Sequence, residues 1–186
     1  MKYLIESIRD ALEKDCLLPA LMSALVIPDA MGQCLYPELV DKKSKKRLIG
    51  QQYKRWFRDW VGDRLLFSGG CDGENESSDT RILTEEMCWQ LRCSLLHSGD
   101  YDVTIYAPER DESFDYNYKF ELVTHGCNAL RTSWAWPEEG ERSTKSVVYR
   151  INAADLSSAL CDAAELCLMK TGNEVVYPEL DLLDLS

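Results

Sequence analysis

The hydrophobic period of this chain changes at Gly99 and again at Asn152. Before Gly99, apolar residues recur every three or four positions, as they do in amphipathic helices. From Tyr101 to Ile151, apolar and polar residues alternate, which is typical of half-buried strands. A helical stripe returns after Asn152 and ends at Gly172. The pattern therefore predicts a mainly α fold with an inserted small antiparallel β-sheet of three or four strands, α+β overall.

The chain has 186 residues, of which 45% are hydrophobic, and this is enough for one domain with a real core. We expect a single domain over residues 1–186, with helical parts at 1–99 and 152–172 and the β insertion at 101–151. A turn is expected at His125–Gly126 in that insertion. The stretch 68–81 is rich in Gly, Ser and acids, so it predicts a mobile loop.

The N-terminal hundred residues predict several amphipathic helices. One runs from Tyr3 to Lys14, and a second begins after Asp15 and ends or kinks near Ile27, because Pro28 lacks a backbone N–H. Asp29 is expected to cap a short following turn, and it is also the acid whose proximity to Arg92 is of most interest. A third helix carries an aromatic face that we expect to be core, formed by Tyr53, Trp56, Phe57 and Trp60.

A further helix is delimited at both ends by the sequence and is expected over Glu85–Ser98. Thr84 is a favourable N-cap, and Gly99 can take the left-handed C-cap conformation. An apolar stripe with wide flanks predicts a helix packed on most of its circumference. Two polar residues, Arg92 and His97, lie within this apolar context and are the candidate functional pair.

Five helical positions turn about 140°, so Arg92 and His97 do not lie on one strict face. His97 is at the helix C-terminus, where the dipole favours a protonated imidazole. The functional interpretation is a proton-transfer site. The alternative is that Arg92 pairs with an acid at the edge of the core and that His97 caps carbonyl groups.

The strings ALVIPDAMG at 24–32, YKRWFRDWV at 53–61 and CWQLRCSLLHSGD at 88–100 resemble HEPN proteins, and so does the Arg-x4-His motif. The resemblance implies a HEPN-like helical bundle that acts as a metal-independent endoribonuclease without a cofactor. Many such enzymes are toxins or defence effectors and work as homodimers with two facing motifs. Arg92 and His97 would then be the catalytic pair, and an antitoxin or regulatory protein a potential partner. Cys93 departs from the pattern, since active members often have Asn, Asp or His there.

The second interpretation is a catalytically idle HEPN-like binding or regulatory module that acts as a dimer. It is favoured by Cys93 and by the net charge of −11, which opposes non-specific adhesion to nucleic acid.

Eight of the 21 basic residues concentrate between 42 and 58, which favours the ribonuclease instead. The candidate RNA-binding residues are Lys45, Lys46, Arg47, Lys54, Arg55 and Arg58. The alternative for this run is a solvated face that balances nearby acids.

Eight cysteines occur without a CxxC pair, so buried reduced thiols are expected. Cys93 and His97 could present two ligands to zinc, but further ligands at a recognisable spacing are missing, and no metal is predicted. We find no apolar run of transmembrane length and no signal-peptide pattern, so the expected location is the cytoplasm, without membrane contact.

The offset between Arg92 and His97 leads to a prediction about assembly. One histidine would have to serve as both base and acid, so we expect two chains to build the site across a two-fold axis. The interface would run through the Arg92–His97 helix, with its apolar circumference and the small residues of 159–164 as the contact surfaces.

Overall fold

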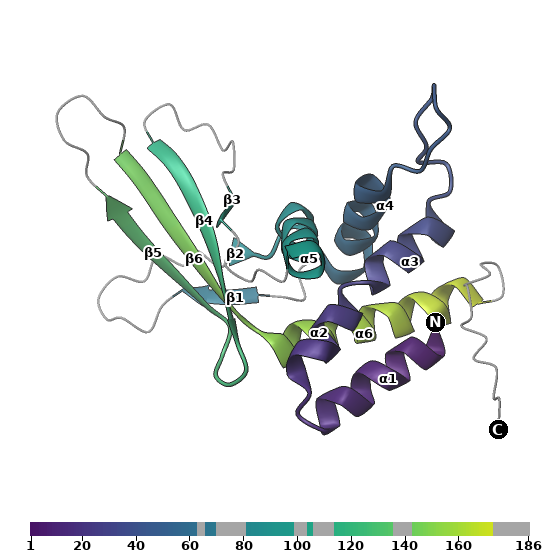
Figure 1. Cartoon of the computed structure of the whole chain (residues 1–186), viewed down its shortest axis with the longest axis horizontal. Coiled ribbons are helices and arrows are strands. Elements are labelled where there is room, and N and C mark those ends of the chain that lie inside the picture. The colour runs from purple at the N-terminus through teal and green to yellow at the C-terminus, as the bar shows by residue number, and fades with distance from the viewer. Residues whose placement is uncertain (63–65, 70–80, 99–103, 106–113, 136–142, 173–186) are drawn as a thin grey trace. The chain divides into compact units, whose positions relative to one another are not determined.

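The computed structural model describes residues 1–62, 66–69, 81–98, 104–105, 114–135 and 143–172 (Figure 1). The fold is mainly helical and also contains a β-sheet. Contacts divide the chain into two compact units. The helical unit comprises residues 1–62 and the part of the C-terminal segment that begins at Ala154, and the sheet unit comprises residues within 63–153.

The helical unit combines helices from the N-terminal part of the sequence with the last helix of the described chain. They are α1 (Lys2–Glu13), α2 (Leu17–Ala24), α3 (Ile27–Leu35), α4 (Ile49–Trp56), the π-helix η1 (Phe57–Val61) and α6 (Ala153–Thr171). The expected break before Pro28 is confirmed, because α2 ends at Ala24 and Pro28 lies in the first turn of α3. The predicted capping role of Asp29 is wrong. Asp29 lies within the first turn of α3, and Val26 occupies the N-cap position.

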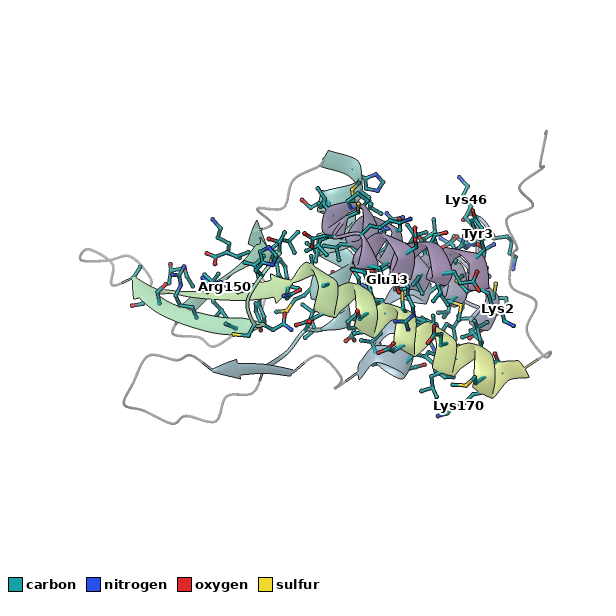
Figure 2. The ribbon with its side chains drawn as sticks, turned by 90° about the horizontal axis from the view of Figure 1, so that it is seen from below. Lys2, Tyr3, Glu13, Lys46, Arg150 and Lys170 are labelled. Carbon is teal, nitrogen blue, oxygen red and sulfur yellow. The ribbon has the colours of Figure 1, made fainter. Side chains whose placement is uncertain are left out.

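The aromatic stripe of α4 and η1 forms the core of the helical unit, as predicted. Tyr53, Trp56 and Phe57 are buried, while Trp60 is half-buried with the Lys170 ammonium 5.9 Å from its ring centroid. Figure 2 shows Lys170 near the end of α6. From α6, the core receives Leu156, Leu160, Cys161, Ala163, Ala164 and Cys167.

Arg9 joins the first and last helices of this unit. Its guanidinium lies 2.8 Å from Asp162 Oδ1 and 3.0 Å from Glu165 Oε2. A second bond, from Arg9 Nε to Glu165 Oε1 at 3.2 Å, makes the contact with Glu165 bidentate. Residues far apart in the sequence therefore fix α6 against α1.

The segment Leu17–Leu35 contradicts the expectation that no apolar run reaches transmembrane length. It spans 19 residues and passes a test of length and composition for a membrane-spanning helix. However, half of this segment is buried inside the protein, and the helix is interrupted at Leu25 and Val26, which separate α2 from α3. The core helix of a soluble protein and a signal sequence near the N-terminus pass the same test, and Leu21, Leu25 and Ile27 of this segment are buried.

The sheet unit contains β1 (Leu66–Gly69), β2 (Arg81–Ile82), α5 (Glu85–Ser98), β3 (Thr104–Ile105), β4 (Phe114–Val123), β5 (Ala129–Ala135) and β6 (Ser143–Asn152). The described strands pair in the order β2-β1-β5-β6-β4-β3. β1 and β2 lie at the two ends of the predicted loop 68–81, and residues 70–80 of that loop are outside the described part of the chain.

The prediction of an antiparallel sheet is wrong, because the sheet is mixed. β4 and β5 are joined by a tight connection but do not pair with each other. Instead β6 lies between them, parallel to β4 and antiparallel to β5 (Figure 1). β1 and β5 form a second parallel pair.

The connection 124–128 crosses the end of β6 and is bonded to it. Asn152 Nδ2 donates to Gly126 O and Asn152 N donates to Asn128 Oδ1, both at 2.7 Å. The five residues span two strand spacings, about 10 Å, which is within reach of an extended chain. Gly126 adopts a φ of 102°, which an L side chain rarely takes. The turn predicted at His125–Gly126 is thus confirmed.

Candidate functional site

The helix that carries Arg92 and His97 has the bounds that the sequence predicts. α5 runs from Glu85 to Ser98, and Thr84 Oγ1 accepts a hydrogen bond from Met87 N at 3.2 Å as an N-cap. Gly99 lies outside the described residues. Of the predicted wide apolar stripe, Met87, Cys88, Leu91 and Leu95 are buried and Leu96 is half-buried. Arg92 is half-buried, and His97 is exposed on the side of the helix opposite the stripe.

Arg92 and His97 are in contact within one chain. Arg92 Nη1 lies 3.1 Å from His97 Nε2. Although the two residues do not lie on one strict face of the helix, their side chains meet. The long Arg92 side chain bridges both the offset and an axial rise of about 7.5 Å along the helix.

The guanidinium sets the direction of this contact. A guanidinium has only N–H donors, so Arg92 Nη1 donates and His97 Nε2 is placed to accept.

Trp89 supports the guanidinium of Arg92 from one turn earlier in α5. Arg92 Cζ lies 5.2 Å from the Trp89 ring centroid, which is a cation–π contact. Trp89 was not among the residues predicted for the site, although its i, i+3 spacing from Arg92 is the signal that could have identified it. The arrangement presents a guanidinium and an imidazole side by side at the surface.

The arginines of the basic run are engaged by acids and amides of the helical unit. Arg47 Nε donates to Gln52 Oε1 at 2.9 Å, and its guanidinium lies 3.7 Å from Asp29. Arg55 lies 2.9 Å from Glu38, and Arg58 is 3.5 Å from Asp59. For these three residues, the interpretation as a face that balances nearby acids describes the structure.

The lysines of the candidate set differ from the arginines. Lys54 is half-buried on α4, whereas Lys45 and Lys46 are exposed in the segment between α3 and α4. All six candidate RNA-binding residues belong to the helical unit, while Arg92 and His97 belong to the sheet unit.

A polar cluster around Tyr36 was not predicted from the sequence. Tyr36 Oη donates to Asp59 Oδ2 at 2.8 Å, and burial together with this bond raises the pKa of Tyr36 to about 12. Arg55 lies over the Tyr36 ring, 4.4 Å from its centroid. Gln52, which is buried, donates through Nε2 to Tyr36 O at 2.8 Å. The cluster joins the end of α3 to α4 and η1.

The thiols agree in part with the expectation of buried reduced cysteines. Cys88, Cys161 and Cys167 are buried, but Cys16 and Cys127 are exposed. Burial raises the pKa of the Cys161 thiol to about 11. Cys93, half-buried, and His97 do not form part of any group of three or more potential metal ligands among the described residues.

The surfaces predicted for a two-chain site are covered within the single chain. The apolar stripe of α5 is buried, and so are Ala163 and Ala164 of α6, while Ala159 is half-buried. Since Arg92 and His97 already meet in one chain, their offset no longer requires a second chain.

No protein-family model, no curated protein and no solved structure matches this chain.

Proposed function

We propose that this protein is a metal-independent endoribonuclease of the HEPN type, working in the cytoplasm, with Arg92 and His97 as its catalytic pair. The observation that supports this most is the 3.1 Å contact between Arg92 Nη1 and His97 Nε2 at the exposed side of α5. Ribose-directed RNA cleavage needs a base for the 2′-hydroxyl and a cation for the phosphate, and these two groups supply both.

The reaction would proceed by attack of the 2′-oxygen on the adjacent phosphorus. His97 Nε2 takes the 2′-hydroxyl proton, and Arg92 neutralises charge on the phosphate oxygens in the transition state. The bond between phosphorus and the 5′-oxygen breaks, and His97 then donates the proton that it has taken to this leaving oxygen. The products are a 2′,3′-cyclic phosphate and a 5′-hydroxyl.

His97 can act as the base only after substrate binding has broken its hydrogen bond with Arg92. In the structure, the Nε2 lone pair accepts the Arg92 hydrogen bond, so it cannot at the same time accept the 2′-hydroxyl proton. A phosphate oxygen is a stronger partner for a guanidinium than a neutral imidazole is. Phosphate binding would therefore turn Arg92 toward the substrate and free His97.

The second candidate is an idle HEPN-like binding or regulatory module. The hydrogen bond between Arg92 and His97 also favours this candidate, because two side chains that bind each other can have a purely structural role. Cys93, which departs from the pattern of active members, favours it as well. The resemblance implies a homodimer and an antitoxin or regulatory partner for either candidate. Such a dimer would use surfaces other than the buried stripe of α5.

Cleavage of purified total RNA and tRNA in EDTA tests the proposal. We expect the intact protein to cut, His97→Ala to lose about 10²–10⁴-fold in rate, and Arg92→Ala a comparable amount. His125→Ala is the matched control, because His125 is the only other histidine and is exposed on the 124–128 connection. It should cut like the intact protein. No cleavage by the intact protein, or equal cleavage by His97→Ala, would favour the idle module.

A further inference from the structure

The segment between α3 and α4 is a closed hairpin with an ordered tip. Val40 and Arg47 form an antiparallel bridge, and Leu48 N donates to Leu39 O at 3.0 Å. Asp41 N donates to Lys46 O at 2.8 Å and Lys45 N to Asp41 O at 2.9 Å. The hairpin projects away from α3 and α4 (Figure 1).

Asp41 organises the tip of this hairpin. Its Oδ1 accepts hydrogen bonds from Ser44 N at 2.6 Å and Lys43 N at 3.1 Å. These bonds hold the pKa of Asp41 below its usual value, so the carboxylate is charged at neutral pH. Lys45 adopts a φ of 58°, which fits a tight turn. The tip therefore has a defined backbone although it is exposed.

Four lysines, Lys42, Lys43, Lys45 and Lys46, project from this tip, and all are exposed. Figure 2 shows Lys46 at the edge of the helical unit. With Asp41, residues 41–46 carry a net charge of +3 in a chain whose net charge is −11. No ion pair joins these lysines to an acid of the described residues, whereas Arg47, Arg55 and Arg58 are each held by one.

We propose that this lysine hairpin, residues 41–46, is a contact site for the phosphodiester backbone of single-stranded RNA. Lysine binds phosphate as a point charge without fixed geometry, which suits a backbone contact independent of sequence. The ordered backbone reduces the entropy lost on binding. The acidic remainder of the chain repels a polyanion, so a strand would be attracted mainly at this hairpin.

The composition of the tip favours a nucleic acid over a lipid surface. Residues 41–46 read Asp-Lys-Lys-Ser-Lys-Lys and include no apolar or aromatic side chain that could enter a bilayer interface. The choice of RNA over DNA rests on the proposed function, whereas the charge argument does not. These lysines belong to the helical unit, whereas Arg92 and His97 belong to the sheet unit.

The test is equilibrium binding of a fluorescein-labelled, mixed-sequence 20-nucleotide RNA, followed by anisotropy across a KCl series. All proteins carry His97→Ala, so that cleavage does not interfere. The test variant changes Lys42, Lys43, Lys45 and Lys46 to Gln, and the matched control changes the same four residues to Arg. We expect the Gln variant to bind at least about tenfold more weakly at low salt. Its salt slope should fall by up to about 2.8, since each phosphate contact on a single strand contributes about 0.7.

The Arg control should keep both the affinity and the slope, because it keeps the charge. Circular dichroism and thermal unfolding of the Gln variant should match the parent, since these side chains are exposed. An unchanged slope in a folded Gln variant would overturn the proposal. So would lysine-dependent binding to phosphatidylserine vesicles together with lysine-independent RNA binding. Lysine-dependent binding in a protein that never cleaves RNA would refute the ribonuclease but leave this contact site intact.

Discussion

Gly32 is the residue at which α3 approaches the backbone of α4. A Cβ built there would lie 2.6 Å from Gln52 O and 2.9 Å from Gln52 C, and neither atom belongs to a flexible side chain. In an ordinary helix, Gly→Ala stabilises by about 1 kcal/mol. Here we expect Gly32→Ala to lower the free energy of unfolding by about 1–3 kcal/mol, because the two helices must move apart. Urea unfolding measures the change, and a gain in stability would show that the helices separate freely.

The sequence identifies the residues of the site but does not predict the contact between them. The helical period, Thr84 and the Arg-x4-His spacing identify α5, Arg92 and His97. They do not specify whether the two side chains meet, because that depends on the rotamer of Arg92 and on its contact with Trp89. The ion pairs of Arg47 with Asp29 and of Arg55 with Glu38 join residues 18 and 17 positions apart, a separation that no local pattern encodes.

At the scale of elements, Asn152 fastens the sheet where β4, β5 and β6 converge. Asn152→Ala removes the donor to Gly126 O and leaves that carbonyl without this bond. We expect a loss of about 1–3 kcal/mol in unfolding free energy. Asn152→Asp should be at least as destabilising, since a carboxylate would face the carbonyl oxygen. Chemical denaturation followed by tryptophan fluorescence tests both variants. Wild-type stability of Asn152→Asp would show that the amide donor contributes nothing.

Strand positions could be predicted from the alternation of residues, but strand order could not. The alternating stretch from Tyr101 to Ile151 contains the observed β3, β4 and β5 and all of β6 except its last residue. A connection as short as 124–128 usually joins two strands that pair as a hairpin. In the observed order β6 lies between β4 and β5. This order depends on contacts between residues far apart in the sequence, namely the pairing of β6 with both strands and the hydrogen bonds of Asn152. β1 and β2 are too short to give a recognisable period.

At the scale of the whole molecule, a site built by two chains could regain activity when Arg92→Ala and His97→Ala chains are mixed, whereas the contact between Arg92 and His97 lies within a single chain. Equal amounts of Arg92→Ala and His97→Ala chains contain no intact pair, whether or not they associate. We therefore expect the mixture to show no more cleavage of tRNA than the separate variants. The control is each variant mixed with intact protein. Recovery of activity in the mixture would demonstrate that arginine and histidine cooperate between chains.

The helical unit is interrupted in sequence by the sheet unit, and this has a consequence for synthesis on the ribosome. Helices α1 to α4 emerge first, but Arg9 meets Asp162 and Glu165, and the core meets Leu156 and Leu160, only after residues 63–153 have been made. At about 5–20 residues per second, these 91 residues take roughly 5 to 20 seconds. During that interval the nascent helices expose the apolar surface that α6 will cover, and chaperones have time to bind it.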